Sequence, residues 1–269
     1  MGRTPRLLSM LLALVLAGCG GSCGTTPSPA SPSALDLTRE TAHFLIHYGA
    51  ADASCIDAVA DHLEANQQRI CDDLRFALNF KVVLKIYPDV TTLHQGMNAP
   101  NAPDWALGMT DLSGQIKIIS PLNPGPNHTF QSILLCMDHE FTHAVVIRGI
   151  GAISLPQWLS EGVADYEARL INAAALAAIA PAVKTDRIPT FSTLATAWSS
   201  YSTLDPMAAY TWSYTIVDFA MTEYGRDTLR PWIDNGANFD STFGVSEAAF
   251  RLRWIEYLKA LFPTRGDTS

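Results

Sequence analysis

Residues 139–143 read His-Glu-Phe-Thr-His, and residues 155–166 read LPQWLSEGVADY. Two histidines four residues apart lie one above the other on a helix face, so their imidazoles can hold one metal ion. The glutamate beside the first histidine, Glu140, can then reach the open position of that ion. The alternative is a pair of core histidines on an amphipathic helix, which the first segment alone does not exclude.

The second segment supplies the group that a metal site of this kind still lacks. It places Glu161 and Asp165 one turn apart on a second helix. A catalytic zinc takes three protein ligands and keeps a fourth position for water, so Glu161 on an antiparallel neighbouring helix would complete a His2Glu set. A metal-bound histidine usually donates its other N–H to a carboxylate, and Asp165 is placed for that role. The alternative for Asp165 is a solvated helix charge.

The residues that precede the two segments predict a small sheet. Residues 43–48 (HFLIHY) and 81–87 (KVVLKIY) are short runs of β-branched and aromatic residues, and between them apolar residues recur at helical spacing. This order predicts a β-α-β unit. Residues 105–120 carry a turn at Ser113-Gly114, which predicts a hairpin that completes the sheet.

Helices are expected throughout the second half. One spans residues 130–147, and the next starts at Pro156 and runs toward Ala182, with a possible break at Pro181. The alanine-rich residues 172–182 are expected to pack in the core. Further helices are expected at residues 210–224 and 246–261. The fold class is therefore α+β: a mixed sheet with a helix in residues 36–125 and a mainly helical layer in 126–265, together one domain.

Composition excludes several classes of protein. Of 269 residues, 48% are hydrophobic and only 16% are charged, so a highly charged disordered chain is excluded. The formal net charge is −8. Such a surface repels phosphate backbones, and we expect no nucleic-acid partner.

The N-terminus has the layout of a secretory leader. Arg3 and Arg6 precede an apolar run at residues 7–17 that is too short to span a bilayer. The run ends in Leu16-Ala17-Gly18-Cys19, which resembles the cleavage box of bacterial lipoproteins; an ordinary secretory leader is the alternative. The resemblance implies a signal peptide at 1–18, a lipidated Cys19 and a flexible tether over 19–35. It also implies an exported protein anchored in a bacterial membrane, and Gly20 favours the outer membrane, facing the periplasm.

The remaining cysteines and histidines suggest no second site. Cys23, Cys55, Cys71 and Cys136 could form two disulfides in any of three connectivities, although one helix would separate Cys55 from Cys71 by roughly 24 Å. On a strand, His43 and His47 would be about 13 Å apart, too far to share an ion. Three further histidines are expected on the surface or in loops: His62, His94 and His128.

The two segments together resemble the gluzincin zinc metallopeptidases, and most closely the bacterial peptidase MA-like group, with its H-E-x-x-H and W-L-x-E-G-x-A patterns. The resemblance implies a zincin-like fold, Zn2+ bound by His139, His143 and Glu161, Glu140 as general base, and a peptide or protein substrate. Its E-x-x-x-D element is matched by Glu161 and Asp165. Related enzymes place a tyrosine or histidine donor over the oxyanion, and here Tyr210 and Tyr214 are the candidates. Tyr210 is preferred because in this group the tyrosine tends to open the helix that this sequence continues as TWSYTIVDFA; both could equally be core aromatics.

One departure from that family bears on the kind of cleavage. The aminopeptidase branch carries G-x-M-E-N on the strand before the zinc helix, whereas this chain has Gly108-Met109-Thr110-Asp111. Endopeptidase action is therefore favoured, with an extended substrate pairing with the edge of the strand at 115–120. The expected function is a membrane-tethered zinc hydrolase that cleaves peptide bonds with metal-activated water. Alternatives are a catalytically silent binding or scaffolding module of the cell envelope and a hydrolase of non-peptide amides in cell-wall material.

Overall fold

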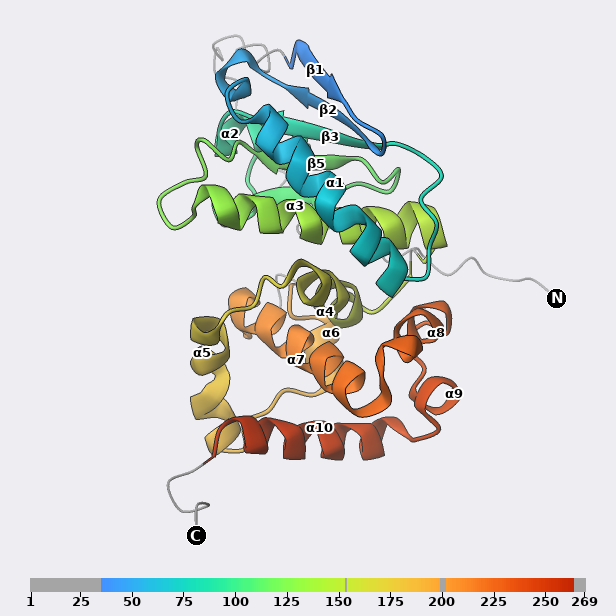
Figure 1. Cartoon of the computed structure of the whole chain (residues 1–269). Helices are drawn as coiled ribbons and strands as arrows, with labels where there is room; N and C mark the ends of the chain where they lie inside the picture. Colours follow the sequence, from blue (N-terminus) through green and yellow to red (C-terminus); the bar gives the residue numbers. More distant parts are fainter. Residues whose placement is uncertain (1–34, 153, 199–201, 264–269) are drawn as a thin grey trace, which may run out of the picture.

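The computed structural model of the chain describes residues 35–152, 154–198 and 202–263. The expected signal peptide, Cys19 and nearly all of the tether lie outside the described residues. Figure 1 shows a sheet layer above a layer of helices, which confirms the predicted α+β class. Within the described ranges, no helix combines the length and the apolar character needed to cross a membrane.

The sheet has the strand order β1-β2-β3-β5-β4 within the described part of the chain. The three inner strands run parallel, and the two outer strands run antiparallel to their neighbours. Helix α1 (Ile56–Asp73) connects β2 to β3, so the predicted β-α-β unit is present. The strands are β1 (Leu37–Glu40), β2 (Phe44–Tyr48), β3 (Val82–Tyr87), β4 (Gly108–Thr110) and β5 (Ile116–Ile119).

The predicted hairpin is present, but its strands are ordered differently from our expectation. Gly114 has φ +76°, the left-handed conformation that a tight turn requires and that glycine adopts without strain. Strand β5 pairs with both β3 and β4, so the prediction of an open edge at 115–120 is wrong. The edge on this side is β4, because the hairpin adds its first strand outside its second.

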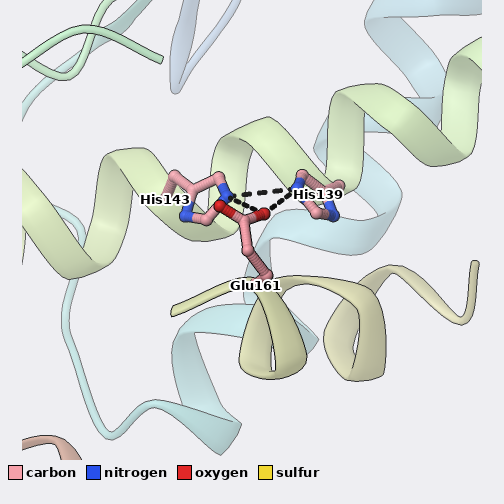
Figure 2. A group of neighbouring side chains, drawn as sticks. All are labelled: His139, His143 and Glu161. Atoms are coloured by element: carbon pink, nitrogen blue, oxygen red, sulfur yellow. Dashed lines mark hydrogen bonds and ion pairs between the residues drawn. The ribbon is translucent and has the colours of Figure 1, made fainter. Parts of the chain in front are cut away.

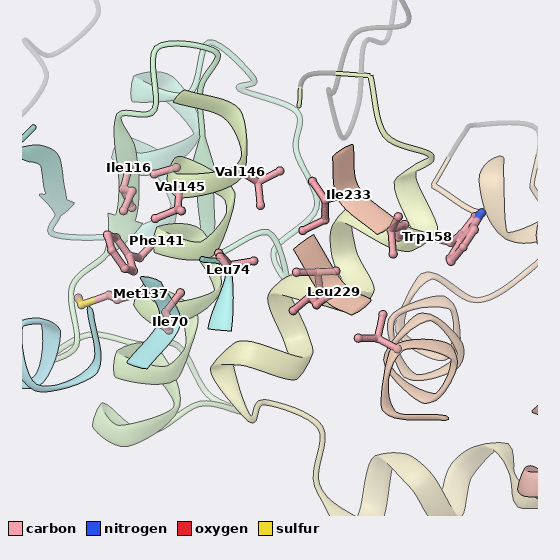
Figure 3. Packing of buried hydrophobic residues seen from close by; sticks show 14 of the residues in the cluster. Ile70, Leu74, Ile116, Met137, Phe141, Val145, Val146, Trp158, Leu229 and Ile233 are labelled. Carbon is pink, nitrogen blue, oxygen red and sulfur yellow. The ribbon is translucent and has the colours of Figure 1, made fainter. Parts of the chain in front are cut away.

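Helix α3 (Phe130–Ala144) carries the H-E-x-x-H segment and lies between the two layers. Its first turn is closed by a capping box in which Thr129 accepts from the Ser132 backbone N–H and the Ser132 hydroxyl accepts in return. A π-helical turn, Val145–Ile150, prolongs the helix to Gly151. The buried apolar face of α3 packs against α1 and β5. Figure 3 shows Phe141 and Val145 beside Ile116 in this core.

The helix expected from Pro156 toward Ala182 is interrupted. Helix α4 (Gln157–Ala168) ends at Arg169, whose φ of +54° lies in the left-handed region, and Asn172 caps the new helix α5 (Ala173–Lys184). Pro181 lies inside α5 rather than at a break. The prediction that the alanine-rich segment packs in the core is also wrong: Ile179 and Val183 are the buried residues of α5. Small side chains offer little area to bury, so this helix lies at the surface.

The other helices complete the lower layer and one end of the sheet. Helix α7 (Pro206–Tyr224) packs along α4, and the helix expected at 246–261 is α10 (Glu247–Leu261). The shorter helices, which were not predicted, are α2 (Val90–Gly96), α6 (Phe191–Ala195), α8 (Leu229–Asp234) and α9 (Phe239–Phe243), with 3-10 turns at Ala50–Asp52 and Arg226–Thr228.

The backbones of α4 and α7 approach closely at Gly162. A Cβ atom on this residue would lie 2.4 Å from the carbonyl oxygen of Ser213, a distance that cannot be tolerated without movement. Gly162 follows Glu161 directly, so this approach also fixes where the Glu161 side chain leaves its helix.

Candidate metal centre

Three buried side chains from two helices meet at the centre of the molecule. His139 and His143 extend from α3, and Glu161 reaches up from α4, as Figure 2 shows. The two Nε2 atoms are 3.1 Å apart, and Oε2 of Glu161 lies 3.3 Å from that of His139 and 3.4 Å from that of His143. The structure thus brings together all three ligands proposed from the sequence.

These distances fit a tetrahedral zinc site. Ligand atoms bonded to zinc at about 2.0–2.1 Å and at tetrahedral angles lie about 3.3 Å from one another. The three measured separations, 3.1, 3.3 and 3.4 Å, are close to that value. Two imidazole nitrogens and one carboxylate oxygen are also a donor set that zinc accepts, and three protein ligands leave a fourth position open.

Each imidazole is oriented by a partner on α4. The Nδ1–H of His139 donates to Oδ1 of Asp165 at 2.9 Å, which turns Nε2 toward Glu161. Nδ1 of His143 lies 3.3 Å from Oγ of Ser160. The sequence singled out Asp165, but not Ser160. Ser160 directly precedes Glu161, and its burial in the helix that faces α3 is what brings it to the second ring.

The electrostatics of the centre favour a bound cation. Burial alone would lower the pKa of His139, but the hydrogen bonds and charges of Asp165, Glu161 and Glu140 outweigh it and raise that pKa well above its usual value. Burial likewise opposes ionisation of Glu161, yet the two imidazoles lower its pKa to about 2. The site therefore holds a Glu161 carboxylate that stays ionised and imidazoles whose surroundings stabilise a positive charge. A bound divalent cation would supply that positive charge.

A cleft of about 440 Å³ opens onto these residues. Its walls come from the segment between α2 and β4 on one side and from α5 and the start of α7 on the other. Most of the lining is apolar, and among the described lining residues there is no lysine or arginine. Such a pocket, with a few convergent polar groups at its base, has the character of a small-molecule or peptide site.

Glu140 faces this cleft from α3. Its carboxylate accepts a hydrogen bond from the Thr110 hydroxyl, with Oγ1 2.7 Å from Oε2. Gly108, on the same strand β4, lies so close that a Cβ atom there would be 3.1 Å from Glu140 Oε1. Strand β4 thus packs directly against the proposed general base, a contact that the sequence did not reveal.

The two candidate tyrosines have different positions. Tyr210 lines the cleft, and its ring centroid is 6.3 Å from that of His139. Burial, followed by the negative charges of Glu161, Asp165 and Glu140, raises the pKa of Tyr210 well above its usual value, so the phenol keeps its proton. Tyr214 is not among the residues that line the cleft, and its ring packs against Tyr166 at 6.2 Å. Only Tyr210 is therefore placed to contact a ligand in the cleft.

Of the three histidines expected on the surface or in loops, one lies in a loop and two are buried or largely buried. His94 is buried in α2 and hydrogen-bonds to the Ala106 carbonyl at 3.0 Å, so the surface assignment is wrong. His62 is largely buried in α1, with Nε2 2.9 Å from Asp138. His128 lies in a loop, as expected, but lines the cleft. The burial of His62 and His94 depends on tertiary packing, which local sequence does not show.

The cysteines of the described part contribute no disulfide and no metal ligand. Cys55, Cys71 and Cys136 are free, so no bridge forms among them, and Cys23 lies outside the described residues. Cys136 lines the cleft one turn before His139. Burial, assisted by the neighbouring carboxylates, raises the pKa of its thiol to about 12, so it remains neutral.

Comparison with protein families agrees with this site. Residues 65–257, well over half of the chain, match the Peptidase MA superfamily. The matched region contains helices α3 and α4 and therefore all three candidate ligands. Comparison with curated proteins gives no match. The match and the geometry of the centre lead to one conclusion: the chain belongs to the Peptidase MA superfamily.

Proposed function

We propose that this protein is a zinc-dependent hydrolase that cleaves peptide bonds with activated water, held at a membrane by a lipid on Cys19. The observation that carries the hydrolase proposal is the meeting of His139, His143 and Glu161 at tetrahedral separations, directly beneath a cleft. Zinc fits this donor set and this geometry better than the oxygen-only ligation that calcium or magnesium prefers.

Each part of a hydrolysis reaction has a residue in this site. Bound zinc would lower the pKa of a coordinated water and polarise the substrate carbonyl. Glu140 faces the cleft and is the group we assign to accept the proton of the attacking water. The protonated hydroxyl of Tyr210 is the donor we assign to the oxygen that becomes negative. Asp165 and Ser160 hold the two imidazoles in the orientation that binding needs.

The cleft favours internal cleavage over removal of terminal residues. An exopeptidase needs a charged group for the free end of its substrate, and the described lining offers no cation for a terminal carboxylate. Asp205 is the lining carboxylate outside the metal centre that could hold a free amine, but it is exposed and caps α7 by accepting from Met207 N. The edge strand β4 offers an extended substrate a backbone to pair with.

Membrane tethering rests on the sequence of the first residues. The Leu16-Ala17-Gly18-Cys19 box implies export and lipidation, and the tether over 19–35 would hold the catalytic domain at a membrane surface. Mass spectrometry of the mature protein would test this directly. A chain that begins at an acylated Cys19 supports the proposal, and one that begins elsewhere without lipid contradicts it.

The hydrolase proposal is tested by metal content and by cleavage of a peptide library. We expect about one zinc per chain in the parent, a large loss in Glu161→Ala, and full metal but no cleavage in Glu140→Gln. Cleavage by Glu140→Gln at the parent's rate would overturn the assigned mechanism. A parent that binds zinc and cleaves no peptide would instead favour the silent binding module.

A further inference from the structure

We propose that Thr110 is a positioning residue that fixes the carboxylate of Glu140 for proton transfer, an inference that rests on the proposed function. Thr110 is the last residue of β4, and its hydroxyl reaches Glu140 across the contact between this strand and α3. Nothing in the H-E-x-x-H pattern points to it, because the two residues are thirty positions apart.

The Thr110 hydroxyl contacts both the backbone and the side-chain carboxylate of Glu140. Thr110 Oγ1 lies 2.8 Å from the backbone carbonyl oxygen of Glu140 and 2.7 Å from its Oε2. A group that touches the main chain and the carboxylate together restricts the torsions between them. Glutamate loses up to about 2 kcal/mol of rotamer freedom when it is fixed, so an unassisted side chain would sample other positions.

Strand β4 also limits the carboxylate from its other side. Gly108 stands two residues before Thr110 and therefore on the same face of the strand. A Cβ atom on Gly108 would lie 2.7 Å from Cδ1 of Ile118 and 3.1 Å from both Cγ and Oε1 of Glu140, so any larger residue here would press on the Glu140 side chain. Thr110 takes Oε2, and Oε1 has no hydrogen-bond partner among the described residues, so Oε1 remains to accept a proton.

This arrangement assigns different tasks to the two oxygens of Glu140. The single proton of the Thr110 hydroxyl is shared between the backbone carbonyl oxygen and Oε2 of Glu140, and hydrogen bonds to carboxylate oxygens are stronger than those between neutral groups. The base is then held in one orientation before substrate arrives. Such preorganisation acts on the rate of the chemical step and leaves binding of substrate and metal largely unchanged.

The test compares Thr110→Val, which keeps the shape without the hydroxyl, with Thr110→Ser, which keeps the hydroxyl. For Thr110→Val we expect kcat to fall about ten- to a hundredfold, with KM and zinc content unchanged, as is typical when a supporting hydrogen bond is lost. Thr110→Ser should recover most of the rate. Thr38→Val is the matched control, since Thr38 lies on β1 at the opposite edge of the sheet.

Crystal structures of the same proteins give a readout that does not require activity. We expect one orientation of the Glu140 carboxylate in the parent and in Thr110→Ser, and a rotated or divided carboxylate in Thr110→Val. An unmoved carboxylate, or an unchanged kcat in Thr110→Val, overturns the positioning role. If Glu140→Gln is inactive while Thr110→Val is fully active, the hydrolase proposal survives and only this inference fails.

Discussion

The Nδ1 atom of His139 lies 2.9 Å from Oδ1 of Asp165, and both side chains are buried. Asp165 stands one turn after Glu161 on α4, so a single helix supplies a proposed ligand and the carboxylate that orients another ligand. A displacement of α4 would therefore disturb two parts of the centre at once.

Removing the charge of Asp165 should weaken metal binding. In Asp165→Asn the side chain keeps its size, but His139 loses the carboxylate that fixes its ring and increases its basicity. We expect the dissociation constant for zinc to rise about ten- to a hundredfold, measured by competition with a chelator. Asp186→Asn is the control, because Asp186 is exposed, pairs with Lys259 and is not part of the metal centre. Equal affinity in Asp165→Asn and the parent would contradict the orienting role.

The two tyrosines of α7 provide a matched pair of variants. Tyr210→Phe removes a hydroxyl from the cleft, whereas Tyr214→Phe removes one from a ring packed on Tyr166. Loss of an oxyanion donor typically lowers kcat by about 10²–10³, so we expect this effect in Tyr210→Phe and little change in Tyr214→Phe. Steady-state kinetics on one peptide substrate measures both. A larger loss of kcat in Tyr214→Phe than in Tyr210→Phe would assign the oxyanion donor to Tyr214 instead.

The sequence predicts the centre of this site better than its surroundings. His139, His143, Glu161 and Asp165 obey spacings of one helical turn, which are local and can be read without a structure. Thr110 and Ser160 reach the site only because β4 and α4 pack against α3. A single serine or threonine has no spacing or motif that would mark it in the sequence.

The predicted fold follows the same distinction between local pattern and tertiary contact. The β-α-β unit, the hairpin and the long helices have clear periodicity, and they are present. Strand β1 was missed because all four of its residues are exposed, which leaves no alternation of apolar and polar positions. The break after α4 was missed because Arg169 adopts a left-handed conformation that residue type alone rarely signals.

Gly162→Ala should destabilise both the fold and the metal centre. The new methyl group would lie 2.4 Å from the Ser213 carbonyl, so α4 and α7 must move apart. Overpacking of this kind costs about 1–3 kcal/mol, which urea denaturation of the metal-free protein would detect. Ala177→Ser on the exposed side of α5 should change the free energy of unfolding by less than about 0.5 kcal/mol. An unchanged stability in Gly162→Ala would show that the helices can separate without cost.

Glu167 should make the protein less stable as the pH rises toward neutrality. Its side chain is fully buried at the end of α4, where it accepts a hydrogen bond from Arg69. Burial, followed by the charge of Asp73, raises its pKa to about 7, against the opposing charges of Arg69 and Arg226. The folded protein therefore keeps this proton between about pH 4.5 and 7, whereas the unfolded chain releases it.

The stabilisation that follows from this proton is complete below about pH 4.5 and is lost as the pH rises through 7. A shift of this size corresponds to roughly 3 kcal/mol. Glu167→Gln cannot ionise, so its free energy of unfolding relative to the parent should rise between pH 5 and 8, measured by urea denaturation with metal chelated. Glu64→Gln is the control and should differ from the parent by a constant amount over this range. Burial opposes ionisation of Glu64, but its hydrogen bonds with His43 lower its pKa below the usual value of 4.5, so its contribution to stability changes only at more acidic pH. A pH-independent difference for Glu167→Gln would mean that Glu167 is already ionised in the folded protein throughout this range.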